Sequence, residues 1–455
     1  MERLADAERP SESEEIWRYS IIDSLDFDAL VPADTYRTYE SESSNNTDRL
    51  EQAKTSLGLS PYIDYCNRIA SQVVGNSAAV IVVYGGVCIA VRHDKNVGGI
   101  SITSLPKEAP KGIESFDNLD EQDGQSQQDV FRLMNSAYGP GPIALDIDKD
   151  TTMDSPIVVV NMPSSDQQRN GAQEDMAGNV QRGDIGQEDP EGEVSTSFSA
   201  LSITIGKRSA ASIIEVVVQA PDDDMARKLF VPVTMMNLED NATLSYANIQ
   251  LLSDSYWQVG HLESIVERNA ELKSLGVPIG GSYARTLTTS TLAGEGGSSE
   301  LMSAYIATDN QTKDMRTIQT HSARHTVSNL LFAGIAGGNS STVYSGLIEI
   351  KPGAKGSNAI QTNRNLILSE QAKADSVPNL TIEENDVHCN HASSTGPIDP
   401  EQVYYLESRG IDTYTARWLI ASGFFSDIYD KNPVADSTKF ISSAIDQRLK
   451  GLEKG

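Results

Sequence analysis

The feature that most restricts the fold of this chain is a long stretch, from Ala79 to about Thr395, built from short apolar segments. Corners rich in glycine, asparagine and serine separate these segments, and helical periodicity is nearly absent apart from pieces such as 129–138. Segments with strand character are 156–160, 200–206, 212–218, 244–252, 344–350, 365–369 and 380–389. Many short strands joined by small polar corners indicate a β-sandwich, a β-barrel or a β-solenoid.

The composition of the strands favours the solenoid. They contain frequent internal Asn, Ser, Thr and Gly, and their corners are not built from the Asn-Gly turns of β-hairpins. A solenoid tolerates both features, because each strand pairs with the coils above and below it and small residues turn its corners. The sequence has no strict repeat. We therefore expect a mainly β core over residues 79–395, which begins with a tight hairpin at Gly85 and Gly86.

Helical patterns return after Thr395 and define a C-terminal helical domain, residues 396–455. Asp399 followed by Pro400 is typical of the start of a helix, and Asp412 starts a second helix. A third pattern, 436–452, places its apolar residues on one stripe. Such a small domain needs the solenoid, the N-terminal helices or a partner to bury its apolar face.

Two other segments stand outside the strand pattern. The N-terminal region, residues 1–78, is polar, and its stretch Leu50–Val74 has apolar residues near helical spacing. The segment 163–195 is glycine-rich and strongly acidic. It has too few apolar residues to offset its ordering entropy, so we expect an insertion in the core that is disordered when the protein is alone.

Charge and hydropathy exclude several classes of protein. The formal net charge is -28, which repels nucleic acid and anionic membrane surfaces. No apolar run is long enough to span a membrane, and the acidic N-terminus does not resemble a signal peptide. The three cysteines, Cys66, Cys88 and Cys389, are few and far apart, as expected of a reducing compartment. We expect a cytoplasmic protein without nucleic-acid or membrane partners.

The richest group of ligand-type side chains lies near the end of the core. If this segment is a strand, Cys389 and His391 share one face and Asp386 and His388 share the other. A thiolate beside an imidazole makes a two-ligand half-site for iron or zinc, which another chain or distant residues would have to complete. The alternative interpretation is a strand end with ordinary polar side chains and a small buried cysteine. The whole group is Glu383, Glu384, Asp386, His388, Cys389 and His391.

Other motifs are less informative. His321 and His325 form a second pair, which we interpret as structural or partner-facing because no glutamate follows as in a metalloprotease helix. The glycine-rich pieces lack a following Lys-Ser/Thr, so no phosphate-binding loop is expected. If ATP is used, another subunit binds it.

From about Ala79 onward the chain resembles the SufB/SufD family of iron–sulfur cluster assembly scaffolds. The most specific part begins ARHTVSNLLFAGIAGG at Ala323 and continues through a Gln-Thr-Asn run at Gln361. It ends with NDVHCNHASSTGPIDPEQVYYLESRGID. The Cys-Asn-His run at Cys389 is similar to a Cys-Ser-His run of the SufD branch, whereas the SufB branch typically has Glu-His-Glu-Ala. The family's Gly-Ala-Thr after the histidine is replaced here by Ala-Ser-Ser-Thr.

This resemblance implies a fold and a set of partners. The core would be a right-handed parallel β-helix flanked by N-terminal and C-terminal helical regions. The chain would be a non-catalytic scaffold subunit that pairs with SufB through the β-helix. It would bind the ATPase SufC through its C-terminal helical domain. The resemblance also leaves room for a homodimer when SufB is absent.

The resemblance also assigns roles to individual residues. His391, and after it Cys389, would be transient ligands of iron or of an iron–sulfur cluster at the SufB interface, with no stably bound cofactor. The residues expected to contact SufC are Tyr404, Leu406, Arg409, Arg417 and Phe424.

Two alternatives stay open at this point. The chain could be SufB-like and carry the cluster itself, for which Cys389 is the candidate cysteine near the site. It could also be a β-helix enzyme acting on polysaccharides, since that fold often carries such activities. Such an enzyme would usually show a signal peptide and acids aligned along one face, whereas the acids here concentrate in loops.

Overall fold

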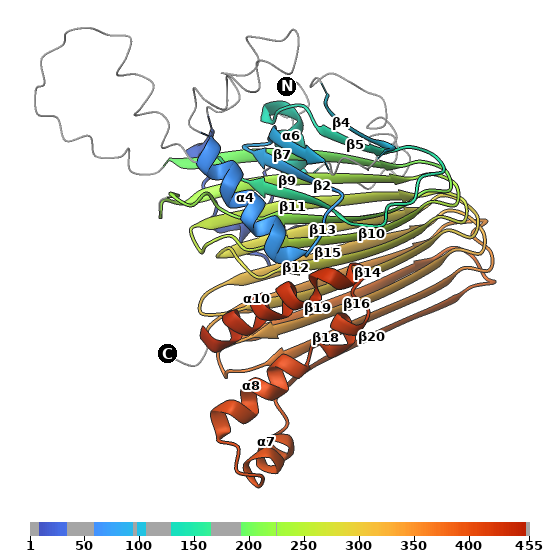
Figure 1. Ribbon diagram of the computed structural model, residues 1–455. Coiled ribbons are helices and arrows are strands. Elements are labelled where there is room, and N and C mark those ends of the chain that lie inside the picture. The colour runs from blue at the N-terminus through green and yellow to red at the C-terminus, as the bar shows by residue number, and fades with distance from the viewer. Residues whose placement is uncertain are drawn as a thin grey trace, which may run out of the picture.

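The protein forms a two-sided parallel β-solenoid with helices at both ends of the chain (Figure 1). Among the described residues, two ten-stranded sheets form the opposite walls, and strands that follow one another along the solenoid lie in alternate walls. The mainly β fold and the solenoid expected from the sequence are thus confirmed. The computed structural model describes residues 9–33, 59–93, 98–105, 129–164, 193–223 and 225–451.

Each wall is named here after its last strand. The β19 sheet contains β1 (Leu30–Pro32), β4 (Ile100–Ser104), β5 (Ile143–Ile147), β7 (Val194–Ile205), β9 (Lys228–Leu238), β11 (Tyr256–Val266), β13 (Tyr283–Leu292), β15 (Thr312–His321), β17 (Ser341–Ile350) and β19 (Lys373–Ile382). The β20 sheet contains β2 (Ala79–Tyr84), β3 (Val87–His93), β6 (Ile157–Met162), β8 (Ala210–Val217), β10 (Thr243–Gln250), β12 (Glu271–Pro278), β14 (Ser298–Ala307), β16 (Val327–Ala336), β18 (Asn358–Ile367) and β20 (His388–Pro397).

The coils stack in register. Tyr283 of β13 pairs with Thr312 of β15, and Thr312 pairs in turn with Ser341 of β17. Side chains at paired positions therefore form ladders along the solenoid, alternately inside and outside the wall. Corners use residues with positive φ, such as Asn241 and Asn269, whose side chains bond one another across neighbouring coils.

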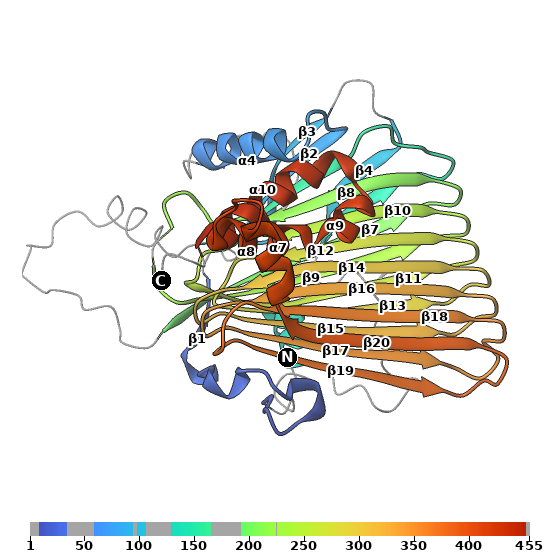
Figure 2. The ribbon, with the colours of Figure 1, turned by 90° about the horizontal axis from the view of Figure 1, so that it is seen from below.

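The two ends of the stack differ. At the N-terminal end, β3 pairs antiparallel with β2 and β4 pairs antiparallel with β5, so that each wall ends in a short antiparallel edge strand. The predicted hairpin is confirmed, and both Gly85 and Gly86 have the positive φ that its turn requires. At the other end β19 and β20 are the last strands of their walls (Figure 2).

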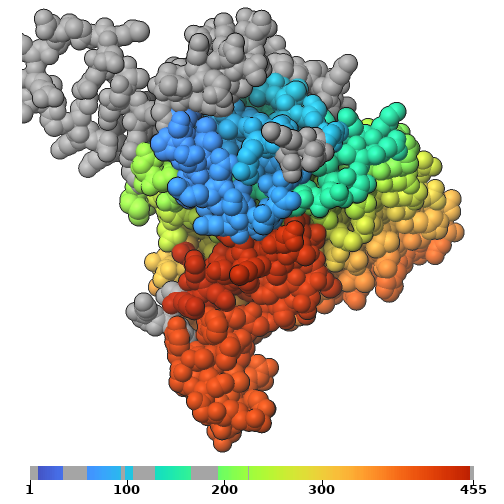
Figure 3. Space-filling model, in the orientation of Figure 1, coloured from blue at the N-terminus to red at the C-terminus, as the bar shows by residue number. Residues whose placement is uncertain are grey.

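The α-helices are α4 (Ser60–Val73), α6 (Val130–Tyr138), α7 (Pro400–Glu407), α8 (Thr413–Gly423), α9 (Ser426–Asp430) and α10 (Thr438–Gly451). Helices α4, α6 and α10 cover the outer faces of the walls, whereas α7 and α8 project from the body (Figures 1 and 3). Short 3-10 turns are η1 (Glu15–Trp17), η2 (Ile22–Ser24), η3 (Phe27–Ala29) and η6 (Ala435–Ser437). Within the described residues, no helix combines the length and apolar character needed to cross a membrane.

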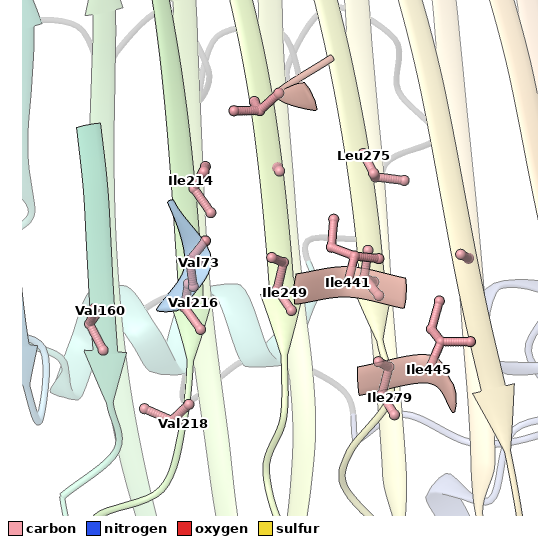
Figure 4. Packing of buried hydrophobic residues seen from close by; sticks show 14 of the residues in the cluster. Val73, Val160, Ile214, Val216, Val218, Ile249, Leu275, Ile279, Ile441 and Ile445 are labelled. Atoms are coloured by element: carbon pink, nitrogen blue, oxygen red, sulfur yellow. The ribbon is translucent and has the colours of Figure 1, made fainter. Parts of the chain in front are cut away.

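Helices from both ends of the chain pack on the β20 sheet. Val73 of α4 and Ile441 and Ile445 of α10 are buried in one apolar cluster with the outer face of this wall (Figure 4). The wall contributes Ile214 and Ile249, among others, to this cluster. Each such side chain stabilises the fold by roughly 1.5–3 kcal/mol. The apolar stripe predicted for residues 436–452 is thereby buried against the solenoid itself.

The β19 sheet is covered by the N-terminal segment and α6. Trp17 packs on Phe131 of α6, and the Arg285 guanidinium lies 3.7 Å from the centre of the Trp17 ring. Arg316 donates hydrogen bonds to the carbonyls of Glu15 and Arg18. Cationic side chains of the wall thus hold a segment some three hundred residues earlier in the chain.

Three sequence-based expectations differ from the structure. The described part of residues 1–78 contains one α-helix, three 3-10 turns and a strand, so that it is less helical than expected. The acidic insertion lies mostly outside the described residues, but Val194 and Ser195, which we assigned to it, begin β7. The segment 380–389 is not one strand, because β19 ends at Ile382 and β20 begins at His388.

Asp129 connects α6 to the covered wall. Its side chain caps α6 by accepting the Phe131 N–H at 3.0 Å, and its other oxygen lies 3.1 Å from His261 Nε2. Burial by itself raises the pKa of Asp129, but His261, Arg285 and the Phe131 N–H outweigh it and hold that pKa at about 2. The carboxylate is therefore more acidic in the folded chain than in the unfolded chain.

Asp129→Asn should weaken the fold at neutral pH by roughly 2 kcal/mol, as the lowered pKa implies. Because the folded-state pKa is depressed, this contribution is present above about pH 4 and is lost as the pH falls toward 2. Urea unfolding followed by circular dichroism at several pH values measures it. Exposed Asp154→Asn is the control and should match the wild type. Equal acid sensitivity of Asp129→Asn and the wild type would contradict this account.

Candidate functional site at the open end of the solenoid

The last coil, made of β19 and β20, is exposed. No residue of either strand is buried, whereas the preceding β17 buries Tyr344, Ile348 and Ile350. Among the described residues β19 pairs only with β17, and β20 only with β18. Each strand therefore leaves one row of backbone N–H and C=O groups without a strand partner.

The side chains of β20 divide between the interior and the exterior. Cys389 packs against the buried cluster that contains Ile348 and Ile350 of the opposite wall, and Ser393 donates a hydrogen bond to Ser376 of β19 at 2.7 Å. Both side chains thus point into the solenoid, and His391, which lies between them, shares their face by strand alternation. His388 and Asn390 lie on the outer face of the strand. The predicted pairing of Cys389 with His391 on one face agrees with this geometry.

Cys389 and His391 differ in their surroundings. Cys389 is a free, half-buried thiol, and burial raises the pKa of that thiol. His391 is exposed at the mouth of the solenoid. A soft sulfur donor and an imidazole suit iron or zinc, and the residues present fit such an ion as half of a ligand set.

The neighbouring carboxylates do not complete this set. Glu384 accepts the Gly353 N–H at 3.2 Å and the Asn385 N–H at 2.8 Å, and these bonds lower its pKa. Asp386 lies 3.3 Å from the Lys355 ammonium. Both acids belong to the corner between β19 and β20 rather than to the inner face. Nowhere in the described part of the chain do three metal-ligand side chains gather.

The second histidine pair is not brought together as a site. His321 is fully buried, with Nδ1 at 2.7 Å from Thr326 Oγ1 and Nε2 at 2.8 Å from Ser328 Oγ. Burial lowers its pKa to about 4, so that it stays neutral inside the solenoid. His325 is exposed at a corner, where it has a positive φ of 56°. His321 is therefore a structural residue of the interior.

A second exposed feature is the helical hairpin of α7 and α8, which projects from the body below the last coil (Figures 1 and 3). Asp399 caps α7 by accepting the Glu401 N–H, and Asp412 caps α8 by accepting the Thr415 N–H, as the sequence predicted. Several exposed aromatic side chains gathered on one element form the kind of patch that marks an interaction surface. The most exposed of them on this hairpin are Tyr404 at 72%, Tyr405 at 57% and Tyr414 at 46%.

The five residues expected to bind a partner on this hairpin have different environments. Tyr404 and Arg409 are exposed, and the Arg409 guanidinium lies 5.1 Å from the centre of the Tyr405 ring. Leu406 is half-buried. Arg417 donates to the Leu368 carbonyl at 2.7 Å, and Phe424 packs against Phe425, so both serve contacts within the chain. Tyr405 and Tyr414 were not anticipated, because exposure of an aromatic residue cannot be read from helical periodicity.

The core of the chain matches one protein family. Residues 187–424, just over half of the chain, match the family described as "SUF system FeS cluster assembly, SufBD core domain". This region contains the solenoid coils from β7 to β20 together with α7 and α8.

Individual relatives agree with this match. The chain is 34% identical to an iron–sulfur cluster assembly SufBD family protein of Mycobacterium leprae, over 47% of this chain and 56% of the relative. It is 31% identical to the iron–sulfur cluster assembly protein SufD of Bacillus subtilis, over 46% of this chain and 48% of that protein. It is 27% identical to SufD of Escherichia coli, over 57% of this chain and 60% of that protein.

The chain thus spans roughly half the length of the curated relatives that it matches. The matched half contains the open end of the solenoid, the Cys389–His391 strand and the helical hairpin. On this evidence the chain belongs to the SufBD family of the SUF iron–sulfur cluster assembly system.

Proposed function

We propose that this chain is a non-catalytic, SufD-like scaffold subunit of the SUF complex, which pairs with SufB and binds the ATPase SufC in the cytoplasm. The observation that carries the proposal is the uncapped last coil, which presents His391 and Cys389 on its inner face. Membership of the SufBD family supports a role in iron–sulfur cluster assembly. It favours a scaffold over the polysaccharide-active enzyme that the β-helix alone would allow.

The uncapped coil is suited to pairing with another scaffold. Natural proteins rarely leave long edge strands without protection, because free N–H and C=O groups recruit other strands. Here both walls end in ten-residue strands at the same end of the solenoid, while at the opposite end they end in the shorter antiparallel strands β3 and β4. A second solenoid that adds its own edge strands would satisfy these groups. SufB is the proposed occupant, and a second copy of this chain would take the same place in its absence.

The inner face of β20 would then lie at the junction of the two solenoids. One thiol and one imidazole supply two of the ligands that iron or a cluster needs, and the remaining ligands must come from another chain. We assign His391 as the principal ligand, completed by a SufB cysteine, and Cys389 as the secondary one. Iron and the nascent cluster are cargo here, held in transit rather than as a resident cofactor.

The α7–α8 hairpin is the proposed docking surface for SufC, the subunit that would supply ATP hydrolysis. Tyrosine and arginine are enriched among the residues that dominate binding energy at protein interfaces. Tyr404, Leu406 and Arg409 lie on this hairpin, and exposed Tyr405 and Tyr414 extend the same surface. Arg417 and Phe424 would support the surface from below, through their contacts within the chain.

A SufB-like role is the second candidate, and Cys389 is the observation that favours it. In that case the thiol, rather than the imidazole, would be the essential ligand. The two roles are separated by the same loading experiment, with Cys389→Ala compared with His391→Ala.

His391→Ala should lose most of the iron and acid-labile sulfide from the chain co-purified with SufB and SufC, while leaving the complex intact. The reason is that the half-site would be reduced to one ligand. His388→Ala is a matched control, since His388 is an exposed histidine on the outer face of the same strand. Full loading of His391→Ala, or equal losses in both variants, would argue against His391 as a ligand.

Tyr404→Ala should weaken binding of purified SufC by about 2 kcal/mol, or roughly thirtyfold in Kd, as expected of a central interface tyrosine. Tyr138→Ala, on α6, removes another exposed tyrosine far from the hairpin and should bind as the wild type does. Isothermal titration calorimetry measures both. Unchanged affinity of Tyr404→Ala would move the ATPase interface elsewhere.

A further inference from the structure

One buried side chain of the solenoid interior has no hydrogen-bond partner within the described structure, and it lies next to the proposed ligand. Gln361 of β18 is fully buried, and neither its Oε1 nor its Nε2 makes a hydrogen bond. The next two inward-facing amides of the same strand are satisfied. Asn363 donates to Tyr305 at 3.0 Å, and Asn365 donates to Asn363 at 2.7 Å. A buried amide without partners costs stability, so its presence calls for an explanation.

The register places Gln361 directly beside His391. The two residues are paired between β18 and β20, on strands about 4.8 Å apart, and their side chains share the inner face. The opposite wall leaves room for the amide, because the facing residue is Gly346. A Cβ atom built on Gly346 would lie 2.5 Å from Gln361 Nε2. Gln361 therefore lies beside His391 on the inner face, one strand further from the open end of the solenoid.

A histidine that binds a metal through one ring nitrogen usually donates the N–H of the other to a fixed acceptor. That hydrogen bond selects the tautomer and orients the ring. Nδ1 is the ring nitrogen nearer the main chain, and Nε2 is the one that reaches furthest from it. An acceptor on the adjacent inner strand is therefore placed to receive the Nδ1 proton.

We propose that Gln361 is a positioning residue for His391. Its amide oxygen accepts no hydrogen bond in the structure, and a rotation of the exposed His391 ring brings the Nδ1–H onto it. This bond leaves Nε2 unprotonated and directed toward the open end of the solenoid. Nε2 is then available to the iron cargo when the second scaffold arrives. This inference rests on the proposed function of His391 as a ligand, but it concerns two residues of this chain and can be tested on the chain alone.

The chain contains a matched control. Gln319 of β15 is also fully buried, faces the interior, and has no partner for either amide atom in the described structure. It pairs with Ser290 and Ile348 rather than with any residue of β20. Gln319→Leu and Gln361→Leu thus remove the same group from similar surroundings, and only the second removes the neighbour of His391.

The test is a long-range proton–nitrogen correlation spectrum of the full-length chain labelled with ¹⁵N-histidine, recorded well above the pH at which imidazole titrates. The chain has six histidines, and the signal of His391 is identified by its loss in His391→Ala. The wild type should show His391 mainly as the Nδ1–H tautomer. Gln361→Leu should shift the ratio of the two tautomers about fivefold toward Nε2–H, the change produced by losing one ordinary hydrogen bond.

Two comparisons make the result decisive. Gln319→Leu should keep the wild-type tautomer ratio, and Gln361→Glu, which retains an acceptor, should keep the Nδ1–H tautomer. Gln319→Leu should melt no lower than the wild type, because it removes an unpartnered buried amide. A wild-type tautomer ratio in Gln361→Leu, or an equal shift in Gln319→Leu, would overturn the proposal.

This experiment is independent of cluster loading. If His391→Ala loads normally while the tautomer responds to Gln361, then Gln361 orients His391 but the ligand role of His391 fails. If His391→Ala loses the cluster while the tautomer does not respond, the ligand role stands and Gln361 has no part in it.

Discussion

Parallel pairing of each strand with the coils on either side of it is the interaction on which the rest of this structure depends. It satisfies the main chain within the stack, but it cannot satisfy the two ends. At the N-terminal end each wall finishes in a short antiparallel strand, β3 or β4, and the outer faces of both walls are buried beneath helices or the N-terminal segment. At the other end β19 and β20 stay exposed. The asymmetry between the ends locates the surface at which a second scaffold would complete the fold.

The same stacking gives the candidate site its chemistry. The interior of the early coils contains aliphatic residues such as Ile203, Leu244 and Leu272, and its buried Glu215 is hydrogen-bonded. The last coils contain His391 and Gln361, and Gln361 has no partner among the described residues. The inner face of β20 therefore carries the ligand atoms of His391 and Cys389, and the unpaired edge of the same strand is where another chain can bind. Because β20 leads directly into α7, the edge strand and the exposed tyrosines of the hairpin belong to one continuous segment. A partner on the hairpin would therefore bind next to the open coil.

Much of this architecture could be predicted from the sequence where local chemistry decides it. Gly85 and Gly86 predicted the first hairpin, and Asp399 and Asp412 predicted the two helix starts. Strand alternation predicted that Cys389 and His391 share a face. Features that depend on distant pairing could not be predicted in this way. The pairing of β1 with β7 joins segments far apart in the chain, and the apolar pattern of 380–389 continues through a corner that only the stacking defines. Gln361 has no hydrogen-bond partner in the described structure because of what the facing wall presents, and this cannot be predicted from residue spacing in the sequence.

Hydrogen exchange of the backbone, measured on the isolated chain and on its complex with SufB, tests the central claim most directly. Those amides of β19 and β20 that point away from β17 and β18 should exchange quickly in the isolated chain, because that side of each strand is unpaired, and they should become strongly protected in the complex. Amides of β3 and β4, at the opposite end of the solenoid, should not change. Protection that appears at β3 and β4, or nowhere in β19 and β20, would show that the open end of the solenoid is not where the two scaffolds meet.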